Sequence, residues 1–294
     1  KDLNQSTFQS HLQVVYPLIE FISINNESHG VITNHLSVSA AALALWSSLT
    51  VEDNSLVLDK KIEKILAARS TEGWFKEYSG ADPGYQTLAL DYLSKIDQLK
   101  PEYKIRSTLE DTIEFLKFMA HPDGSFGGSY GSRNTRFVYP AGIEEISKYY
   151  EPTKPLTAFI RSAHQNGTVV SLNCMDDSNL IPMFNSFCRA AVLFEKISKC
   201  KLKMPYERSP FSKSFNEAGI IVNKTEEHYN IINWKKGGAY YSSKYGRSGG
   251  MLAKDRNGEW YSSQGSSGAK LLESNSKQVV IETPLKRQSN AFPT

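Results

Sequence analysis

Apolar residues recur three and four positions apart over the first two-thirds of this 294-residue chain. This spacing is typical of amphipathic helices that bury one face. It predicts eight helices, over approximately residues 7–24, 34–50, 57–69, 84–98, 104–120, 137–150, 154–165 and 181–200. Because short and Gly-rich connections alternate between these segments, we expect the helices to pair into about four hairpins.

The longer connections share a short sequence pattern, in which a polar residue and a glycine precede an apolar or aromatic pair. The glycines are Gly30, Gly73, Gly124 and Gly167, at intervals of 43, 51 and 43 residues. Intervals of this length are typical of stacked supersecondary repeats. We expect the hairpins to form an (α/α) toroid-like domain, whose loops would gather at one end and bring their polar side chains to a single site.

Beyond Pro205 the pattern changes to short runs rich in Val, Ile, Tyr and Trp, separated by turn signals. Such runs are typical of antiparallel strands. They predict strands at residues 218–225, 228–234, 239–243, 251–254, 259–262 and 278–283, with a hairpin turn at 255–258. We therefore expect a multidomain α+β protein, with a helical domain over 1–204 and an antiparallel β-sandwich over 205–294. Six strands are few for a sandwich, which leaves open whether it is incomplete.

Individual residues mark where several helices begin. Thr33 or Asn34 is expected to cap the second helix, since short polar side chains accept hydrogen bonds from first-turn amides. Asp82 is an expected cap for the fourth helix, and Pro83 falls in its first turn, where proline is tolerated. Residues 175–178 could hold a cation or cap the last helix, and a cap is favoured.

Composition and charge narrow the class of protein. The net charge is only +3, and Lys and Arg are scattered among Asp and Glu, so we expect no nucleic-acid partner. No apolar run approaches 18 residues, so we expect no membrane insertion. Cys174, Cys188 and Cys200 fit neither a disulfide framework nor a zinc motif, and are expected to be core thiols.

No metal and no cofactor are expected, and the oligomeric state stays open. The chain starts at Lys1 without a charged-then-apolar leader. We therefore expect a cytoplasmic protein, or a periplasmic or secreted one after removal of a signal.

The first candidate for chemistry is the pair Asn34-His35 at the start of the second helix. An Asn amide can donate to a carboxylate, and a His can act as a general base near neutral pH. The alternative is that Asn34 is a helix cap and His35 a structural residue.

The second candidate is the loop over residues 72–85, which holds acids, aromatics and phenols together. Trp74 could stack on a sugar ring or plug the loop against the core. Tyr85 could be an acid or base, or a packed core residue. Glu77 and Asp82 could bind substrate, and Asp82 could equally be a cap.

The third candidate is the Gly-rich loop over residues 121–139. The Arg133 guanidinium matches a carboxylate or sulfate, unless it pairs with Asp82 or Glu77. Substrate contacts are also expected from Tyr130, Asn134 and Tyr139. His121 is expected at a helix end, where a cation suits the helix dipole, and residues 235–238 are expected to form a solvated hairpin.

Together these motifs resemble the heparinase II/III-like group of polysaccharide lyases. The resemblance spans residues 7–283 and is carried by the Asn-His pair, the Gly-Trp-Phe-x-Glu loop that ends in Tyr, and the Pro-Asp-Gly-Ser-Phe loop, all ahead of a β domain. It implies an (α/α) toroid followed by a β-sandwich, and β-elimination of a uronate-containing glycan. It also implies that Asn34 neutralises the uronate carboxylate, that His35 is the base, and that Tyr85 is the acid/base residue.

We therefore expect a carbohydrate-active protein whose partner is an acidic polysaccharide or oligosaccharide, most simply a polysaccharide lyase-like enzyme. Two alternatives stay open. One is a glycan-binding or polysaccharide-assembly protein without activity. The other is a glycoside hydrolase that uses paired acids, Glu77 with Asp82 or with Asp123.

Overall fold

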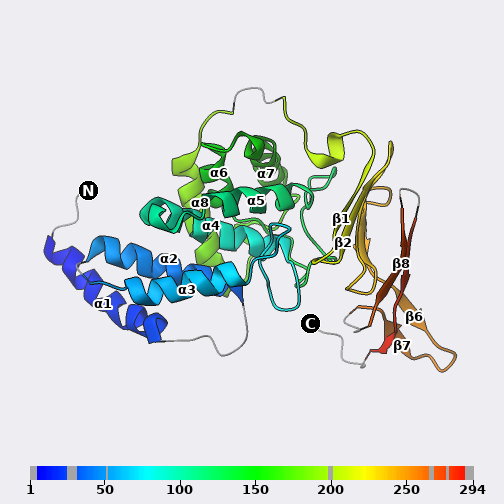
Figure 1. Cartoon of the computed structure of the whole chain (residues 1–294), viewed down its shortest axis with the longest axis horizontal. Coiled ribbons are helices and arrows are strands. Elements are labelled where there is room, and N and C mark those ends of the chain that lie inside the picture. The colour runs from blue at the N-terminus through cyan, green and yellow to red at the C-terminus, as the bar shows by residue number, and fades with distance from the viewer. Residues whose placement is uncertain are drawn as a thin grey trace.

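The computed structural model describes residues 5–24, 32–50, 52–197, 201–264, 268–275 and 278–288. Within these ranges a helical region comes first and antiparallel sheets follow it (Figure 1). The first of the four expected Gly loops, around Gly30, and Cys200 lie outside the described residues.

The helical region contains a helix at each of the eight predicted positions. They are α1 (Gln5–Ile24), α2 (Thr33–Leu49), α3 (Ser55–Ala67), α4 (Pro83–Leu99), α5 (Arg106–Lys117), α6 (Ala141–Ser147), α7 (Lys154–Asn166) and α8 (Asp177–Leu193). Short 3-10 turns lie at Pro101–Tyr103, Glu151–Thr153, Leu172–Cys174 and Pro205–Glu207. Among the described residues, no helix is both long enough and apolar enough to cross a bilayer.

The even-numbered helices pack against one another in a continuous row, α2 on α4, α4 on α6 and α6 on α8. The odd-numbered helices flank this row: α1 and α3 pack on α2, α5 on α4 and α7 on α6. Figure 1 shows α1, α2 and α3 at one side of the helical region. The hairpin arrangement predicted from the loop spacing therefore appears as a row of helices with a second layer beside it.

Local signals at two helix starts are confirmed. The Asp82 side chain accepts a hydrogen bond from the Tyr85 amide at the N-terminus of α4, with Pro83 in the first turn. The Asp176 side chain likewise accepts from the amides of Ser178 and Asn179 at the start of α8. In both cases the capping side chain and the capped amides lie within three residues of each other, so the local sequence is enough to predict the cap.

Two other expectations are wrong. Neither Thr33 nor Asn34 caps α2, because Ile32 occupies the N-cap and both residues lie inside the first turn with their side chains bonded elsewhere. Cys174 and Cys188 are exposed and are not core thiols.

The β region contains a five-stranded antiparallel sheet and two smaller ones. The large sheet has the order β1 (Phe211–Phe215), β2 (Ile220–Lys224), β3 (Tyr229–Asn233), β4 (Ala239–Ser242) and β5 (Arg247–Gly249). A three-stranded sheet has the order β10 (Lys286–Arg287), β7 (Trp260–Ser262) and β6 (Leu252–Lys254), and a separate hairpin joins β8 (Lys270–Ser274) to β9 (Val279–Glu282).

All six predicted strands are present, and the predicted turn at 255–258 connects β6 to β7. The sequence pattern did not reveal β1, β5, β8 and β10. The central register pairs Ile221 of β2 with Ile232 of β3.

One face of the large sheet packs on the helical region, as Figure 1 shows for β1 and β2. In β3 the side chains of Tyr229 and Ile231 are buried, and the Tyr229 hydroxyl donates to the Phe118 carbonyl oxygen at 2.8 Å. Phe115 of α5 meets Phe215 of β1 edge-on, with ring centroids 5.0 Å apart. A single hydrophobic core therefore extends across the helical and β regions, and the sheet packs against the helical loops.

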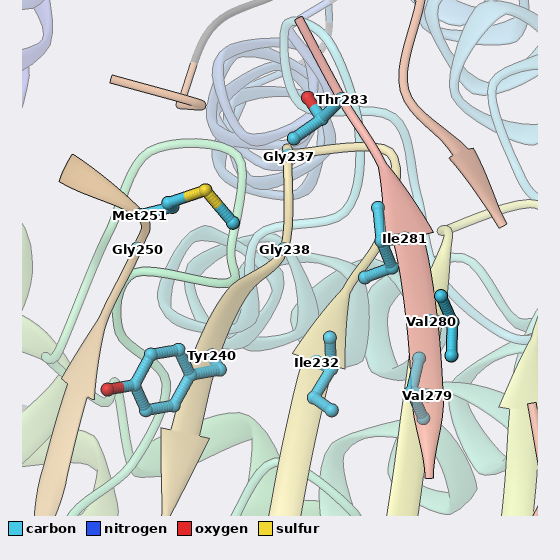
Figure 2. A pocket seen from close by; sticks show the side chains of 10 residues that line it. All are labelled: Ile232, Gly237, Gly238, Tyr240, Gly250, Met251, Val279, Val280, Ile281 and Thr283. Carbon is cyan, nitrogen blue, oxygen red and sulfur yellow. The ribbon is translucent and has the colours of Figure 1, made fainter. Parts of the chain in front are cut away.

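The opposite face of the large sheet borders an apolar groove of about 460 Å³ (Figure 2). Ile232 of β3 and Tyr240 of β4 form one side, and Val279 and Ile281 of β9 form the other. Among the described residues, its lining holds no charged side chain, and its polar side chains are those of Tyr240 and Thr283. The groove therefore lacks a cation that could pair with an acidic sugar.

Candidate functional site

A buried carboxylate organises the start of α2. Ile32 and Glu77 form an isolated antiparallel bridge. One oxygen of the Glu77 carboxylate accepts the Asn34 backbone N–H at 2.7 Å, and the other accepts the Asn34 side-chain amide at 2.8 Å. Both side chains are buried. Glu77 thus takes the place of a local N-cap, because its negative charge meets the free amides and positive dipole end of the helix.

This pairing fixes the position of the first predicted catalytic residue. The side-chain amide of Asn34 points at Glu77, 43 positions further along the chain, and only 2% of Asn34 is exposed. The Glu77 loop in turn contacts the third loop, since the Ser132 hydroxyl donates to the Glu77 carbonyl oxygen at 2.8 Å.

His35 lies on a different face of α2, because successive helical residues are rotated by about 100°. Its side chain is exposed and lines a groove of about 270 Å³ together with Phe21 of α1 and Lys61 of α3. The groups that act electrostatically on Tyr85 come instead from residues 77–82 and from Arg133. The three predicted catalytic residues, Asn34, His35 and Tyr85, are therefore not all brought together. Asn34 is linked to the surroundings of Tyr85 through Glu77, whereas His35 is not.

Asp82 joins the second loop to the third. Besides capping α4, its buried carboxylate accepts the Arg133 backbone N–H at 2.7 Å and the Thr135 hydroxyl. Thr135 also accepts the Gly84 amide at 3.0 Å. A Cβ at Gly84 would collide with the Thr135 side chain, so the close approach of these two loops requires glycine at this position.

Polar side chains gather on the outer surface of these joined loops. We call them the Arg133 cluster, and define it as Tyr78, Tyr85, Arg133, Asn134 and Lys236. The Arg133 guanidinium lies over the Tyr78 ring, with Cζ 4.2 Å from the ring centroid. Arg133 and Asn134 are exposed, and Tyr78 is 39% exposed. The cluster therefore presents an aromatic ring and a cation to solvent.

Two members of the cluster adopt the left-handed backbone conformation, with φ of +58° at Tyr78 and +59° at Asn134. Asn tolerates this conformation, whereas a bulky residue such as Tyr adopts it rarely. Conformations of this kind persist where the surrounding structure imposes them, and they are concentrated at functional sites. Here Asp82 and Glu77 supply the surrounding hydrogen bonds.

Tyr85 stands half-buried beside this surface. Its ring meets Phe137 edge-on, with centroids 5.3 Å apart. Burial raises the pKa of the Tyr85 phenol above its ordinary value, and the neighbouring Tyr78 and Asp82 raise it further, while Arg133 acts in the opposite direction. Tyr85 therefore keeps its proton at neutral pH and can donate it.

Lys236 reaches the cluster from the turn between β3 and β4. Its Nζ donates to the Asn134 side-chain oxygen at 2.7 Å and to the Gly131 carbonyl oxygen. Lys236 is half-buried, so the expectation of a solvated hairpin at 235–238 is wrong for this residue. No local sequence signal pointed to it, because its partner lies 102 positions away.

Three of the predicted substrate-binding aromatics are buried. Trp74 is 7% exposed and its indole N–H donates to Glu72 at 3.0 Å, while Tyr130 and Tyr139 have no exposed surface. Glu72 also accepts the backbone amides of residues 217 and 218, so the Trp74 loop is fastened against the β region. In this structure these rings pack the protein, whereas Tyr78 faces solvent.

His121 is not a cation at a helix end, because α5 ends at Lys117 and the imidazole is buried. The ring stacks on Tyr241 of β4, with centroids 3.6 Å apart, and shares hydrogen bonds with Ser125 at 2.8 Å and Tyr130 at 2.9 Å. Burial lowers the pKa of His121 to about 3, so the ring is neutral at physiological pH. It attaches the third loop to the sheet.

Among the described residues, the other ionisable candidates form no cluster that could ligate a metal. Within the described ranges, no group of three or more His, Cys, Asp or Glu side chains converges at a distance that could hold a metal ion. His228, the histidine of the β region, is half-buried and lies 3.5 Å from the Glu227 carboxylate.

No model of a protein family matches this chain, and neither a curated protein nor a solved structure matches it. The resemblance to the heparinase II/III-like group therefore rests on sequence motifs. The strongest basis for a function is the geometry of the Arg133 cluster.

Proposed function

We propose that this protein binds an acidic, uronate-containing glycan at the Arg133 cluster. The observation that carries the proposal is the exposed Arg133 guanidinium held over the Tyr78 ring, 4.2 Å from its centroid. A guanidinium can form two parallel hydrogen bonds to one carboxylate. An aromatic ring suits the apolar C–H face of a pyranose.

The support beneath the cluster favours a preorganised site. The backbone of Arg133 is held by Asp82 at 2.7 Å, and the loop that carries Tyr78 is held by the Asn34–Glu77 pair. Because these contacts already exist in the free protein, little ordering free energy would be lost when a sugar binds. The buried carboxylates of Glu77 and Asp82 have a structural role in this proposal.

Polysaccharide β-elimination is the second candidate function, and the position of Tyr85 favours it. In such a reaction a base removes the C5 proton of the uronate, a C4=C5 double bond forms, and the C4–O glycosidic bond breaks. Tyr85 would give its proton to the departing oxygen, since its raised pKa keeps the phenol protonated. Arg133 would neutralise the carboxylate, which is the role that the resemblance assigns to Asn34.

The geometry supports the proton-donor half of this reaction better than the base half. His35, the base implied by the resemblance, lies in the groove with Phe21 and Lys61. A glycoside hydrolase with Glu77 and Asp82 as its acids receives less support, because both side chains are fully buried and accept hydrogen bonds from the protein itself.

The same proposal includes the finer fold. The consecutive packing of α2, α4, α6 and α8, with the other helices beside them, supports an (α/α) toroid-like arrangement. The large sheet and the β8–β9 hairpin that faces it across the apolar groove support a sandwich-like β region (Figure 2).

Binding can be tested by titration calorimetry with oligosaccharides of polygalacturonate, alginate and hyaluronan, and with a neutral cello-oligosaccharide as control. We expect at least one acidic oligosaccharide to bind. Arg133→Ala should weaken its binding by about 1.5–3 kcal/mol, or roughly 10- to 150-fold, through loss of a charge-assisted contact. The control variant is Arg106→Ala, because Arg106 also lies over a tyrosine ring, that of Tyr149 at 4.4 Å, on helix α5, where it pairs in addition with Asp97 at 3.1 Å.

Equal loss of affinity in the two variants would contradict a site at Arg133, and so would equal binding of the neutral sugar. Activity is measured separately on the acidic oligosaccharide that binds. A lyase generates an unsaturated uronate that absorbs in the ultraviolet, whereas a hydrolase generates reducing ends without that absorbance.

A further inference from the structure

We infer that the β region completes the glycan site through Lys236, which positions the turn carrying Arg133 and adds a second cation beside it. The inference rests on the proposed function and adds a specificity-determining residue to it. Lys236 belongs to the turn between β3 and β4, and its Nζ donates to Asn134 at 2.7 Å and to the Gly131 carbonyl oxygen. Arg133 lies between these two contacts in the chain.

The turn that carries Lys236 is itself anchored to the helical region. Asn233, at the end of β3, accepts the Lys236 backbone N–H at 3.0 Å and donates its side-chain amide to the Tyr130 carbonyl oxygen at 2.8 Å. A Cβ at Gly237 would collide with the Ser263 carbonyl oxygen, so the turn lies directly against residue 263 and requires glycine at this position. One buried Asn therefore fixes both Lys236 and the residue that precedes the Arg133 turn.

Further contacts bind the same loop to the sheet. The Ser129 hydroxyl donates to the carbonyl oxygens of Tyr240 at 3.1 Å and Gly249 at 3.2 Å, and the Arg136 guanidinium donates to the Ser248 hydroxyl at 3.0 Å. These contacts lie on the N-terminal and C-terminal sides of Arg133. The sheet therefore constrains the turn on both sides of Arg133, and Lys236 bonds to Gly131 and Asn134 between these contacts.

The effect on Arg133 follows from the backbone. Asn134 is left-handed, with φ of +59°, and Lys236 engages its side chain in that conformation. On the other side Asp82 accepts the Arg133 backbone N–H. Asp82 thus holds the backbone before the Arg133 Cα, and Lys236 holds the residue after it, Asn134. The Arg133 side chain is therefore directed over Tyr78. Removal of the Lys236 ammonium would release one of these two restraints.

The charge of Lys236 also belongs to the site. Burial lowers the pKa of Lys236 to about 8, with the nearby Asp82 raising it and Arg133 lowering it. The attraction of Asp82 outweighs the repulsion between the two cations, so burial is what leaves the pKa of Lys236 below its ordinary value. A bound carboxylate would stabilise the charged form of Lys236. Because Lys236 loses this charge as the pH rises above about 8, the affinity for an acidic glycan should fall over the same range.

The test compares Lys236→Met with Lys235→Met by titration calorimetry at pH 6.5, 7.5, 8.5 and 9.5, using oligogalacturonate and oligoalginate as probes. Lys235 is the matched control, because it is exposed in the same turn and its Nζ donates to the Glu217 carbonyl oxygen at 3.0 Å. We expect Lys236→Met to weaken binding about tenfold at pH 6.5 and to remove most of the decline above pH 8. Lys235→Met should resemble the unaltered protein.

A second measurement requires no glycan. Hydrogen exchange of the backbone amides of residues 131–135 should accelerate in Lys236→Met and stay unchanged in Lys235→Met. If the unaltered protein binds neither of these probes nor a hyaluronan oligosaccharide, the proposed function fails, and the exchange data still decide whether Lys236 positions the turn. If the protein binds a probe but the two variants show the same affinity, pH profile and exchange, the inference about Lys236 is overturned.

Discussion

The substitution Glu77→Gln tests whether a buried carboxylate organises the surface that carries Tyr78. Each oxygen of Glu77 accepts one donor from Asn34, at 2.7 and 2.8 Å. Gln has nearly the same shape but offers one acceptor and one NH₂ group. One of the two Asn34 donors would therefore face another donor inside the protein.

The magnitude follows from two contributions. A buried donor left without an acceptor costs about 1–3 kcal/mol, and loss of a negative charge at a helix N-terminus costs about 0.3–1 kcal/mol. Together they predict that the free energy of unfolding falls by about 1.3–4 kcal/mol. The measurement is urea denaturation monitored by circular dichroism, at a pH near 7.

Glu63→Gln provides the control, because Glu63 lies exposed on α3 and changes the net charge identically. It should alter the unfolding free energy by less than about 0.5 kcal/mol. If Glu77→Gln proves as mild as Glu63→Gln, the carboxylate does not cap α2 and the proposed support for Tyr78 is incorrect.

The remaining predictions concern Tyr85 and His164. Tyr85→Phe should abolish eliminative cleavage, measured by ultraviolet absorbance, while calorimetry shows that affinity falls tenfold or less; full activity would refute the proton-donor role. The two ring nitrogens of His164 make no hydrogen bond of good geometry within the described structure, although the Val138 backbone lies near enough to raise the pKa slightly, and the ring packs against Phe187. His164→Phe should therefore raise the unfolding free energy by about 1 kcal/mol. Burial lowers the folded-state pKa of His164 to about 4 from 6.5, so its neutral form stabilises the fold at high pH and this contribution is lost as the pH falls from 6.5 towards 4. Urea titrations across that range should show a shallower decline in the variant, and parallel declines would contradict this account.

Features that depend on neighbouring residues were predictable from the sequence. The Asp82 and Asp176 caps contact amides no more than three residues away, and the eight helices follow from apolar spacing within each segment. The strands that escaped prediction lack such a pattern: β1 carries Ser, Lys and Ser between two Phe residues, and β5 is Arg-Ser-Gly. Their strand conformation comes from pairing with β2 and β4.

The candidate site was predictable only in part. The loops that contain Tyr85 and Arg133 were identified, because Gly-rich loops with phenols and a guanidinium suggest binding. The division between buried and exposed members was not identified: Tyr130 and Tyr139 are buried, and Tyr78 faces solvent. Tyr130 is covered where the sheet meets the loop, beside Asn233, and Tyr139 is covered by Leu88 of α4 and Met183 of α8, so no local pattern contains that information.

The amino-acid sequence by itself determined the helices, most strands, two caps and the loops that carry the polar side chains, because these follow from interactions over a few residues. Tertiary structure alone decided that Glu77 caps a helix 43 positions earlier and that Lys236 reaches Asn134 across 102 positions. It also decided that His121 is buried and neutral. These contacts join segments that are remote in the chain, so they come into being only when the sheet and the helical loops pack together.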